Sequence, residues 1–259
     1  MEKILYKDLC GFLVAAVCVY GCAGRINQKK AMEHYNKGMI LFREQQWEGA
    51  LTELKKAKEY NPENDVVLNA IGLAAFYNGR LPEAAFYYKK AIAIEPNQPD
   101  YYNNLAASLS ALGKQEEAIK YCKKALSFPS YHTPEFAYFN LGTAYYQLRQ
   151  YTQAKKSFEK SYETNPLYID PYYQLGRTLI KLSEFEKAIK QLKEAEELRK
   201  KFNYENPEVK AGIYYHLGLA YMKLKKYSES IHYLRKVRQE DSVYLEKEAA
   251  KLLERIELK

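Results

Sequence analysis

The residue types that most often carry enzyme chemistry are scattered along this chain. The four histidines are His34, His132, His216 and His232. None of them belongs to an HExxH motif or to a comparable metal-ligand spacing. The sequence has no glycine-rich loop of the kind that cradles phosphate, and its many carboxylates form no distinctive pair. We therefore predict no catalytic site, no metal site and no cofactor, and we expect no small-molecule substrate.

Cysteine is the reactive residue whose position is informative. Three of the four cysteines lie within the first 22 residues, where an uncharged and mostly apolar run at 9–21 ends at Cys22. This run is too short to span a bilayer, which takes about 20 residues, but it has the length of a signal-peptide core. Its end, Gly21-Cys22, resembles the lipobox of bacterial lipoproteins, although Tyr20 is bulkier than the residue usual there.

The lipobox resemblance implies a signal peptide at 1–21 and acyl chains, such as palmitate, on Cys22. Ala23 follows the cysteine where a retention signal would have Asp, which implies transfer to the periplasmic face of the outer membrane. Residues 22–30 are polar and are predicted to form a lipidated tether that reaches at most ~30 Å. The alternative is an ordinary signal peptide, or an uncleaved anchor, with an incidental cysteine.

A pattern of 34 residues organises the rest of the chain. In the stretch 65–98, two apolar helical patterns are joined by a turn at 78–80, with Gly72 on the first pattern and Tyr88 on the second. This is the helix–turn–helix signature of the tetratricopeptide repeat. The small residue of the first helix recurs as Gly38, Gly72, Ala106, Gly142, Gly176 and Gly218, and the bulky residue of the second as Leu54, Tyr88, Cys122, Phe158, Leu192 and Leu234.

The six copies predict an all-α fold, a tetratricopeptide superhelical solenoid of six helix–turn–helix repeats with a C-terminal capping helix. A repeat array buries a continuous core between neighbours and needs a polar cap at its end. The predicted repeats cover 31–64, 65–98, 99–134, 135–168, 169–210 and 211–244, and the cap covers 245–259.

Two repeats are longer than the others. The third carries a two-residue insertion within 126–135, where Pro129 and Pro134 disfavour helix just before them. The fifth carries a longer insertion around 201–207. Insertions in repeat arrays map to loops that can contact partners. The second insertion is equally compatible with a lengthened helix end followed by a turn.

The charge pattern argues against a nucleic-acid partner. The formal net charge is +8, from 40 basic and 32 acidic residues, and the two signs are interleaved along the helical patterns. We interpret this as a solvated helical surface.

Function is therefore predicted to depend on protein binding at the face that the first helices of the repeats form. Part of this stripe must pack between repeats. A groove that clamps chaperone carboxylates would carry Lys or Arg where Tyr35 and Met39 stand, which argues against that ligand. The predicted partner-binding groove consists of Met32, Tyr35, Met39, Phe42, Asn69, Leu73, Phe76, Asn103, Phe139, Tyr146 and Tyr173.

The lipobox, six repeats, the insertion after the third repeat and the cap together resemble the type IV pilus pilotin lipoproteins, the PilF/PilW/Tgl family. The stretch 125–135, which runs into 139–142, is the most similar segment. The resemblance implies a lipid-anchored outer-membrane assembly factor whose partners are secretin subunits. Two alternatives remain open at this point. One is a general envelope scaffold for cell-wall or polysaccharide export machinery, and the other is a non-catalytic accessory subunit of an envelope enzyme.

Overall fold

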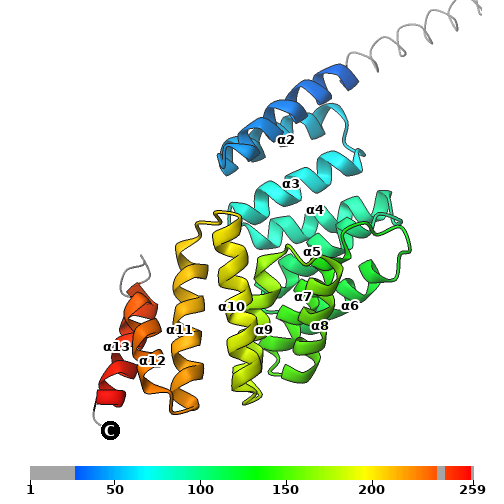
Figure 1. The fold of residues 1–259 in the computed structure, drawn as a ribbon. Helices are drawn as coiled ribbons and strands as arrows, with labels where there is room; N and C mark the ends of the chain where they lie inside the picture. The colour runs from blue at the N-terminus through cyan, green and yellow to red at the C-terminus, as the bar shows by residue number, and fades with distance from the viewer. Residues whose placement is uncertain (1–26, 238–242, 258–259) are drawn as a thin grey trace, which may run out of the picture. The chain divides into compact units, whose positions relative to one another are not determined.

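Every regular element in the described part of the chain is an α-helix, which confirms the all-α tetratricopeptide prediction (Figure 1). The structure, a computed structural model, describes residues 27–237 and 243–257. The predicted signal peptide and Cys22 lie outside these residues.

In the first of two compact units, Met1–Leu112, the described residues form helices that each pack on the next along the chain. The helices α3 and α5, which begin two successive repeats, also contact each other. Its helices are a helix at residues 27–43, α2 (Trp47–Tyr60), α3 (Asp65–Tyr77), α4 (Leu81–Ile94) and α5 (Pro99–Ala111).

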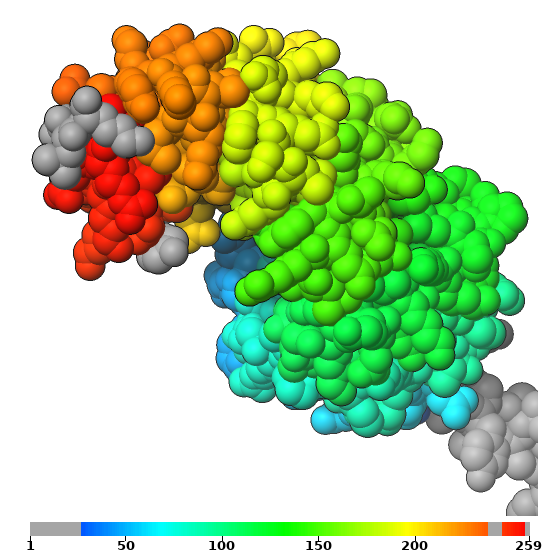
Figure 2. Space-filling model, turned by 90° about the horizontal axis from the view of Figure 1, so that it is seen from below, coloured from blue at the N-terminus to red at the C-terminus, as the bar shows by residue number. Residues whose placement is uncertain are grey.

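The second compact unit, Gly113–Lys259, is built in the same way, and in Figure 2 its colours follow one another in chain order from green to red. Here α13 packs against α11 and α12 and buries Ala249, Leu252, Leu253 and Ile256. Its helices are α6 (Gln115–Leu126), α7 (Pro134–Gln147), α8 (Tyr151–Thr164), α9 (Ile169–Lys181), α10 (Phe185–Lys201), α11 (Pro207–Lys223), α12 (Tyr227–Val237) and α13 (Val243–Glu257).

The turn inside each repeat has one residue in the left-handed region. After α3, for example, Gly79 has φ 75°, and the N–H of Arg80 donates to the carbonyl of Ala75 at 2.8 Å. This bond satisfies a carbonyl at the helix end and closes a Schellman turn. The same position is left-handed in all six repeats, at Gln45, Gly79, Gly113, Arg149, Ser183 and Lys225.

The recurring spacing of small and bulky residues has a steric cause. A Cβ at Gly72 would lie 2.6 Å from the ring of Tyr88, and one at Gly142 would lie 2.7 Å from the ring of Phe158. Real Cβ atoms do not approach other atoms so closely, so the two helices of these hairpins cross at a distance that only glycine allows. The same relation links Gly38 to Leu54, Gly176 to Leu192, and Gly218 to Leu234.

The insertion in the fifth repeat lengthens two helices. Helix α10 has 17 residues where α8 has 14, and α11 has 17 where α9 has 13. The end of α10 repeats the turn chemistry of the other hairpins, because Asn203 is left-handed with φ 51° and the Tyr204 N–H donates to the Arg199 carbonyl at 2.9 Å. Helix α11 begins at Pro207, four residues before the predicted boundary at 211, because proline is well suited to the first turn of a helix.

The tether prediction is wrong for residues 27–30, which are helical. The sequence there lacks hydrophobic periodicity, but Lys29 lies 4.0 Å from Glu33 one turn later, and the Lys30 ammonium lies 5.4 Å from the ring centroid of Tyr60. These contacts extend the first helix toward the N-terminus from the buried Ala31.

Candidate functional site

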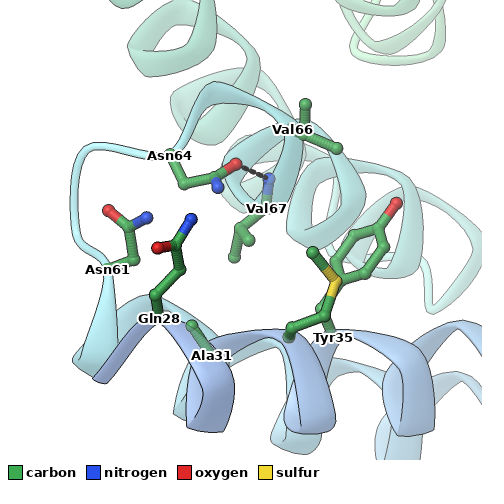
Figure 3. Close-up of a pocket in the computed structure, with 8 residues that line it drawn as sticks. Gln28, Ala31, Tyr35, Asn61, Asn64, Val66 and Val67 are labelled. Atoms are coloured by element: carbon green, nitrogen blue, oxygen red, sulfur yellow. Dashed lines mark hydrogen bonds between the residues drawn. The ribbon is translucent and has the colours of Figure 1, made fainter. Parts of the chain in front are cut away.

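A small pocket opens beside the first helix. Figure 3 shows Gln28, Ala31 and Tyr35 rising from that helix, with Asn61 and Asn64 on the turn before α3 and Val66 and Val67 at its start. Met32 completes the lining. The N-cap residue Asn64 fixes the start of α3, because its Oδ1 accepts a hydrogen bond from the Val67 N–H at 3.0 Å.

The size and chemistry of the pocket suit one apolar side chain. Its volume is about 170 Å³. An apolar cavity of about 150 Å³ holds a benzene ring, whereas sites for drug-sized ligands and cofactors run from about 300 to 1,000 Å³. No carboxylate, imidazole, thiol or amine lines it. The arrangement can bind a side chain among apolar and amide groups, but its lining holds no pair of groups for acid–base catalysis.

The structure brings two of the predicted groove residues, Met32 and Tyr35, into this pocket. Met39 and Phe42 are half-buried on the same helix and do not line it. The ring of Phe42 instead lies 5.1 Å from that of Trp47 and 5.5 Å from that of Tyr77. Phe42 therefore contributes to packing between the first helix, α2 and α3.

The other predicted groove residues of the first unit are less accessible than Met32. Leu73 and Phe76 are half-buried on α3, and Asn69 accepts a hydrogen bond from the Asn104 amide at 3.0 Å. Asn103 is 8% exposed, so little of it can reach a partner in this conformation.

The three predicted residues of the second unit have two different surroundings. Phe139 belongs to the core cluster around Phe158, with ring centroids 5.8 Å apart. Tyr146 and Tyr173 both lie near Arg177, whose guanidinium carbon is 5.0 Å and 5.6 Å from their ring centroids. Arg177 lies on the same helix as Tyr173, and it is not among the predicted groove residues.

Asn61, Asn64 and Gln28 are also site residues that the groove prediction missed. The signal for Asn64 was present in the sequence, since asparagine directly before an apolar helical pattern is a favoured N-cap. The tether prediction includes Gln28 and so places it outside the array.

The described part of the chain has neither a metal-binding cluster nor a helix that could cross a membrane. Those residues contain no group of three His, Cys, Asp or Glu side chains placed to hold a metal ion. Within the same residues, no helix combines the length and the hydropathy that a bilayer crossing requires.

Family models identify the repeated unit. Models described as tetratricopeptide repeat match residues 31–64, 66–98, 87–120 and 211–237. A model described as anaphase-promoting complex, cyclosome, subunit 3 matches residues 114–195. Together with the six left-handed turns and the glycine crossings, these matches decide the assignment. The chain is a tetratricopeptide-repeat protein. Proteins of this fold are in general non-catalytic scaffolds that bind other proteins.

Curated relatives share the repeats with this tetratricopeptide protein. Mouse tetratricopeptide repeat protein 12 is 28% identical over 205 residues, which cover 66% of this chain and 28% of the mouse protein. Hsp70-Hsp90 organizing protein 2 of Arabidopsis thaliana is 28% identical over 141 residues, which cover 54% of this chain and 24% of that protein. The chain thus spans less than a third of either relative's length.

Two solved structures are similar over almost their whole length. PilW, a widely conserved type IV pilus biogenesis factor, matches with a TM-score of 0.74 and 19% identity, and the match covers 84% of this chain and 97% of PilW. Pseudomonas aeruginosa PilF matches with a TM-score of 0.68 and 20% identity, and the match covers 87% of this chain and 99% of PilF. At these identities the likeness shows the fold.

Proposed function

We propose that this tetratricopeptide protein is an outer-membrane lipoprotein that helps the secretin of a type IV pilus to assemble. The observation that carries the proposal is the extent of the likeness to PilW and PilF, each of which is spanned nearly from end to end. The two matches also cover 84% and 87% of this chain, so the likeness extends over most of the repeat array. The lipobox-like Gly21-Cys22 supports the membrane part of the proposal.

In the proposed mechanism, a lipid anchor confines the repeats to the membrane surface, and the repeats bind a secretin subunit there. Acyl chains on Cys22 would hold the repeats at the membrane where a secretin ring forms, and two or more chains give a stable anchor where one chain does not. Holding a subunit beside that surface raises its effective concentration there, so modest affinity is enough to favour assembly. No step requires chemistry from the protein.

The pocket beside the first helix supplies a docking position for this role. A helical or extended segment is recognised in a groove through a few spaced apolar anchors. The cavity lined by Met32 and Val66 accepts one such anchor, and the amides of Asn61 and Gln28 lie at its rim for contact with a backbone.

Loss of the anchor is expected to abolish ring assembly. In a strain that lacks this gene, the secretin should remain monomeric, and the wild-type gene should restore heat-resistant multimers. Cys22→Ser should remove the protein from the membrane fraction, prevent labelling by a palmitate analogue and reduce multimers at least about tenfold. Normal multimers in the deletion strain would contradict the proposal.

A charge in the pocket is expected to weaken secretin binding at least about tenfold. Met32→Glu places a carboxylate where an apolar anchor would sit, and an unpaired charge there must lose its water on binding. Met32 is 55% exposed, so the melting temperature should change little. Ile40→Glu is the matched control, because Ile40 is 52% exposed on the same helix and does not line the pocket. Binding of purified secretin measured by calorimetry tests this, and equal effects of both variants would exclude the pocket.

A further inference from the structure

We propose that Arg177 is the centre of a second protein-binding surface, which recognises an acidic side chain in an extended segment of a partner protein. This surface lies in the compact unit Gly113–Lys259, whereas the pocket beside the first helix lies in Met1–Leu112. The inference goes beyond secretin assembly and holds whatever protein carries the segment.

Two aromatic rings lie close to the guanidinium of Arg177. Its carbon lies 5.0 Å from the ring centroid of Tyr146 on α7 and 5.6 Å from that of Tyr173 on α9. Both distances fall within the range of a cation–π contact. Gly212 on α11 leaves the room that the Tyr173 hydroxyl occupies, since a Cβ at that position would collide with it. We call Tyr146, Tyr173 and Arg177 the arginine bracket.

The hydrogen-bonding capacity of this guanidinium is largely unused. Arginine has five N–H donors. In the described part of the chain, Nη1 donates to Gln174 Oε1 at 2.8 Å, Nε is buried without an acceptor, and no carboxylate lies within ion-pair distance. A buried donor without an acceptor is uncommon and calls for an explanation.

Other arginines of the protein show what is missing from the bracket. Arg80 lies 2.7 Å from a Glu48 oxygen, and Arg199 lies 2.9 Å from a Glu196 oxygen. Arg177 contacts two tyrosine rings, and in the described part of the chain it has no such acid partner. A planar guanidinium can receive a carboxylate through two parallel hydrogen bonds.

The groups around the bracket leave it positive at neutral pH. His216 packs against the ring of Tyr173 at 5.7 Å, and its Nδ1 lies 2.7 Å from the Gly212 carbonyl oxygen. Burial, together with the nearby charges of Arg177 and Lys181, lowers the pKa of His216 to about 4, so its imidazole is neutral. The charges that act on His216 and Tyr173 include those of Arg177 and Lys181, with Glu208 acting on Tyr173 from α11.

This charge balance favours a single carboxylate over a polyanion. Nucleic acids and polyphosphates are bound by several cations along one face. The bracket offers one guanidinium, two tyrosine rings and one opposing glutamate nearby, which suits one Asp or Glu flanked by apolar or aromatic residues. Half-buried positions also strengthen such a pair, because water screens it less than it would at an exposed site.

A peptide selection tests the proposal and requires no purified partner. Random twelve-residue peptides displayed on phage are selected on the full-length protein in detergent, after depletion on the Arg177→Gln variant. The selected peptides should share an Asp or Glu at one position. Each peptide and its acid-to-amide analogue are then measured on both proteins. The acid-to-amide change should weaken binding to the wild type about tenfold and binding to Arg177→Gln less than twofold, as a direct charge pair requires.

The controls separate recognition from stability. Arg235→Gln removes an exposed arginine from α12 and should leave peptide binding unchanged. Arg177→Lys keeps the charge and loses the planar fork, so it should bind the acidic peptides with intermediate affinity even if Arg177→Gln melts early. Selected peptides without a shared acidic position, a selection that yields no binder, or equal amide effects on both proteins would each overturn the inference. A normal secretin phenotype would leave it intact.

Discussion

Phe158→Ala is expected to lower the free energy of unfolding of the unit Gly113–Lys259 by about 3–5 kcal/mol. The ring of Phe158 is 0% exposed and packs with Ala154, Leu175 and Leu179 in one core cluster. Removing it deletes the buried apolar surface and leaves a cavity that the crossing helices cannot close, since glycine at position 142 supplies no side chain to fill it. Guanidinium denaturation followed by circular dichroism measures the loss.

A second substitution tests whether the ring of Phe158 is the reason that position 142 requires glycine. Gly142→Ala should destabilise the wild type, because its Cβ would lie 2.7 Å from the ring of Phe158. In the Phe158→Ala background, Gly142→Ala should leave the free energy of unfolding unchanged or raise it by up to about 1 kcal/mol, since alanine is the better helix former. Phe136→Ala is the control, because Phe136 is 42% exposed at the start of α7 and should lose less than about 1 kcal/mol. Additive effects of the first two substitutions would contradict a direct contact.

The repeat could be predicted from the sequence because its determinants are local and recur. Each glycine of a first helix is matched by a bulky residue 16 positions later, as Gly72 is by Tyr88, and the structure places the two in contact. The turn position was harder to identify, since glycine stands there at 79 and 113 and other residues stand at the remaining four. Packing of the flanking helices imposes the left-handed conformation on those residues, at a cost that their own propensity does not reveal.

The functional surface was predicted less completely than the fold, because it depends on contacts between side chains of different helices. A face at helical spacing contains both packed and exposed positions, and sequence does not separate exposed Met32 from buried Asn103. Arg177 became notable only when Tyr146 was found beside it from another helix. The tether at 27–30 was predicted from missing periodicity, yet contacts with Glu33 and Tyr60 make it helical.

The lengthened fifth repeat is held by a buried ion pair. Arg199 Nε donates to Glu196 Oε2 at 2.9 Å, both residues are buried, and the Tyr214 hydroxyl of α11 donates to Glu196 Oε1 at 2.8 Å. Arg199 also donates to Glu205, in the turn that follows α10, at 3.1 Å. The pair therefore joins the extra turn of α10 to the following turn and to α11. Burial raises the pKa of Glu196, but the hydrogen bonds from Arg199, Tyr214 and Lys200 outweigh it and hold that pKa below its usual range.

Removing one partner of this pair is expected to cost about 3–5 kcal/mol, because it leaves a buried charge without compensation. Arg199→Met should show this loss at pH 7. Glu196→Gln should also destabilise at pH 7, and its difference from the wild type should shrink as the pH falls below 4.5. A carboxylate with a lowered pKa stabilises the fold only while it is ionised, and protonation removes the ion pair from the wild type as well.

Replacing Glu196, Arg199 and Tyr214 together by apolar residues should cost less stability than removing one partner of the ion pair alone. Arg199→Met combined with Glu196→Leu and Tyr214→Phe removes the two charges and the hydroxyl together, and it should recover most of the stability that Arg199→Met loses. Lys200→Met is the control for charge alone, since Lys200 touches Glu196 from an exposed position and should cost less than about 1 kcal/mol. If the triple variant is as unstable as Arg199→Met, the ion pair itself, rather than the filling of buried space, holds α10 to α11. If the triple variant instead recovers its stability, the loss in Arg199→Met comes from leaving the Glu196 charge buried without a partner.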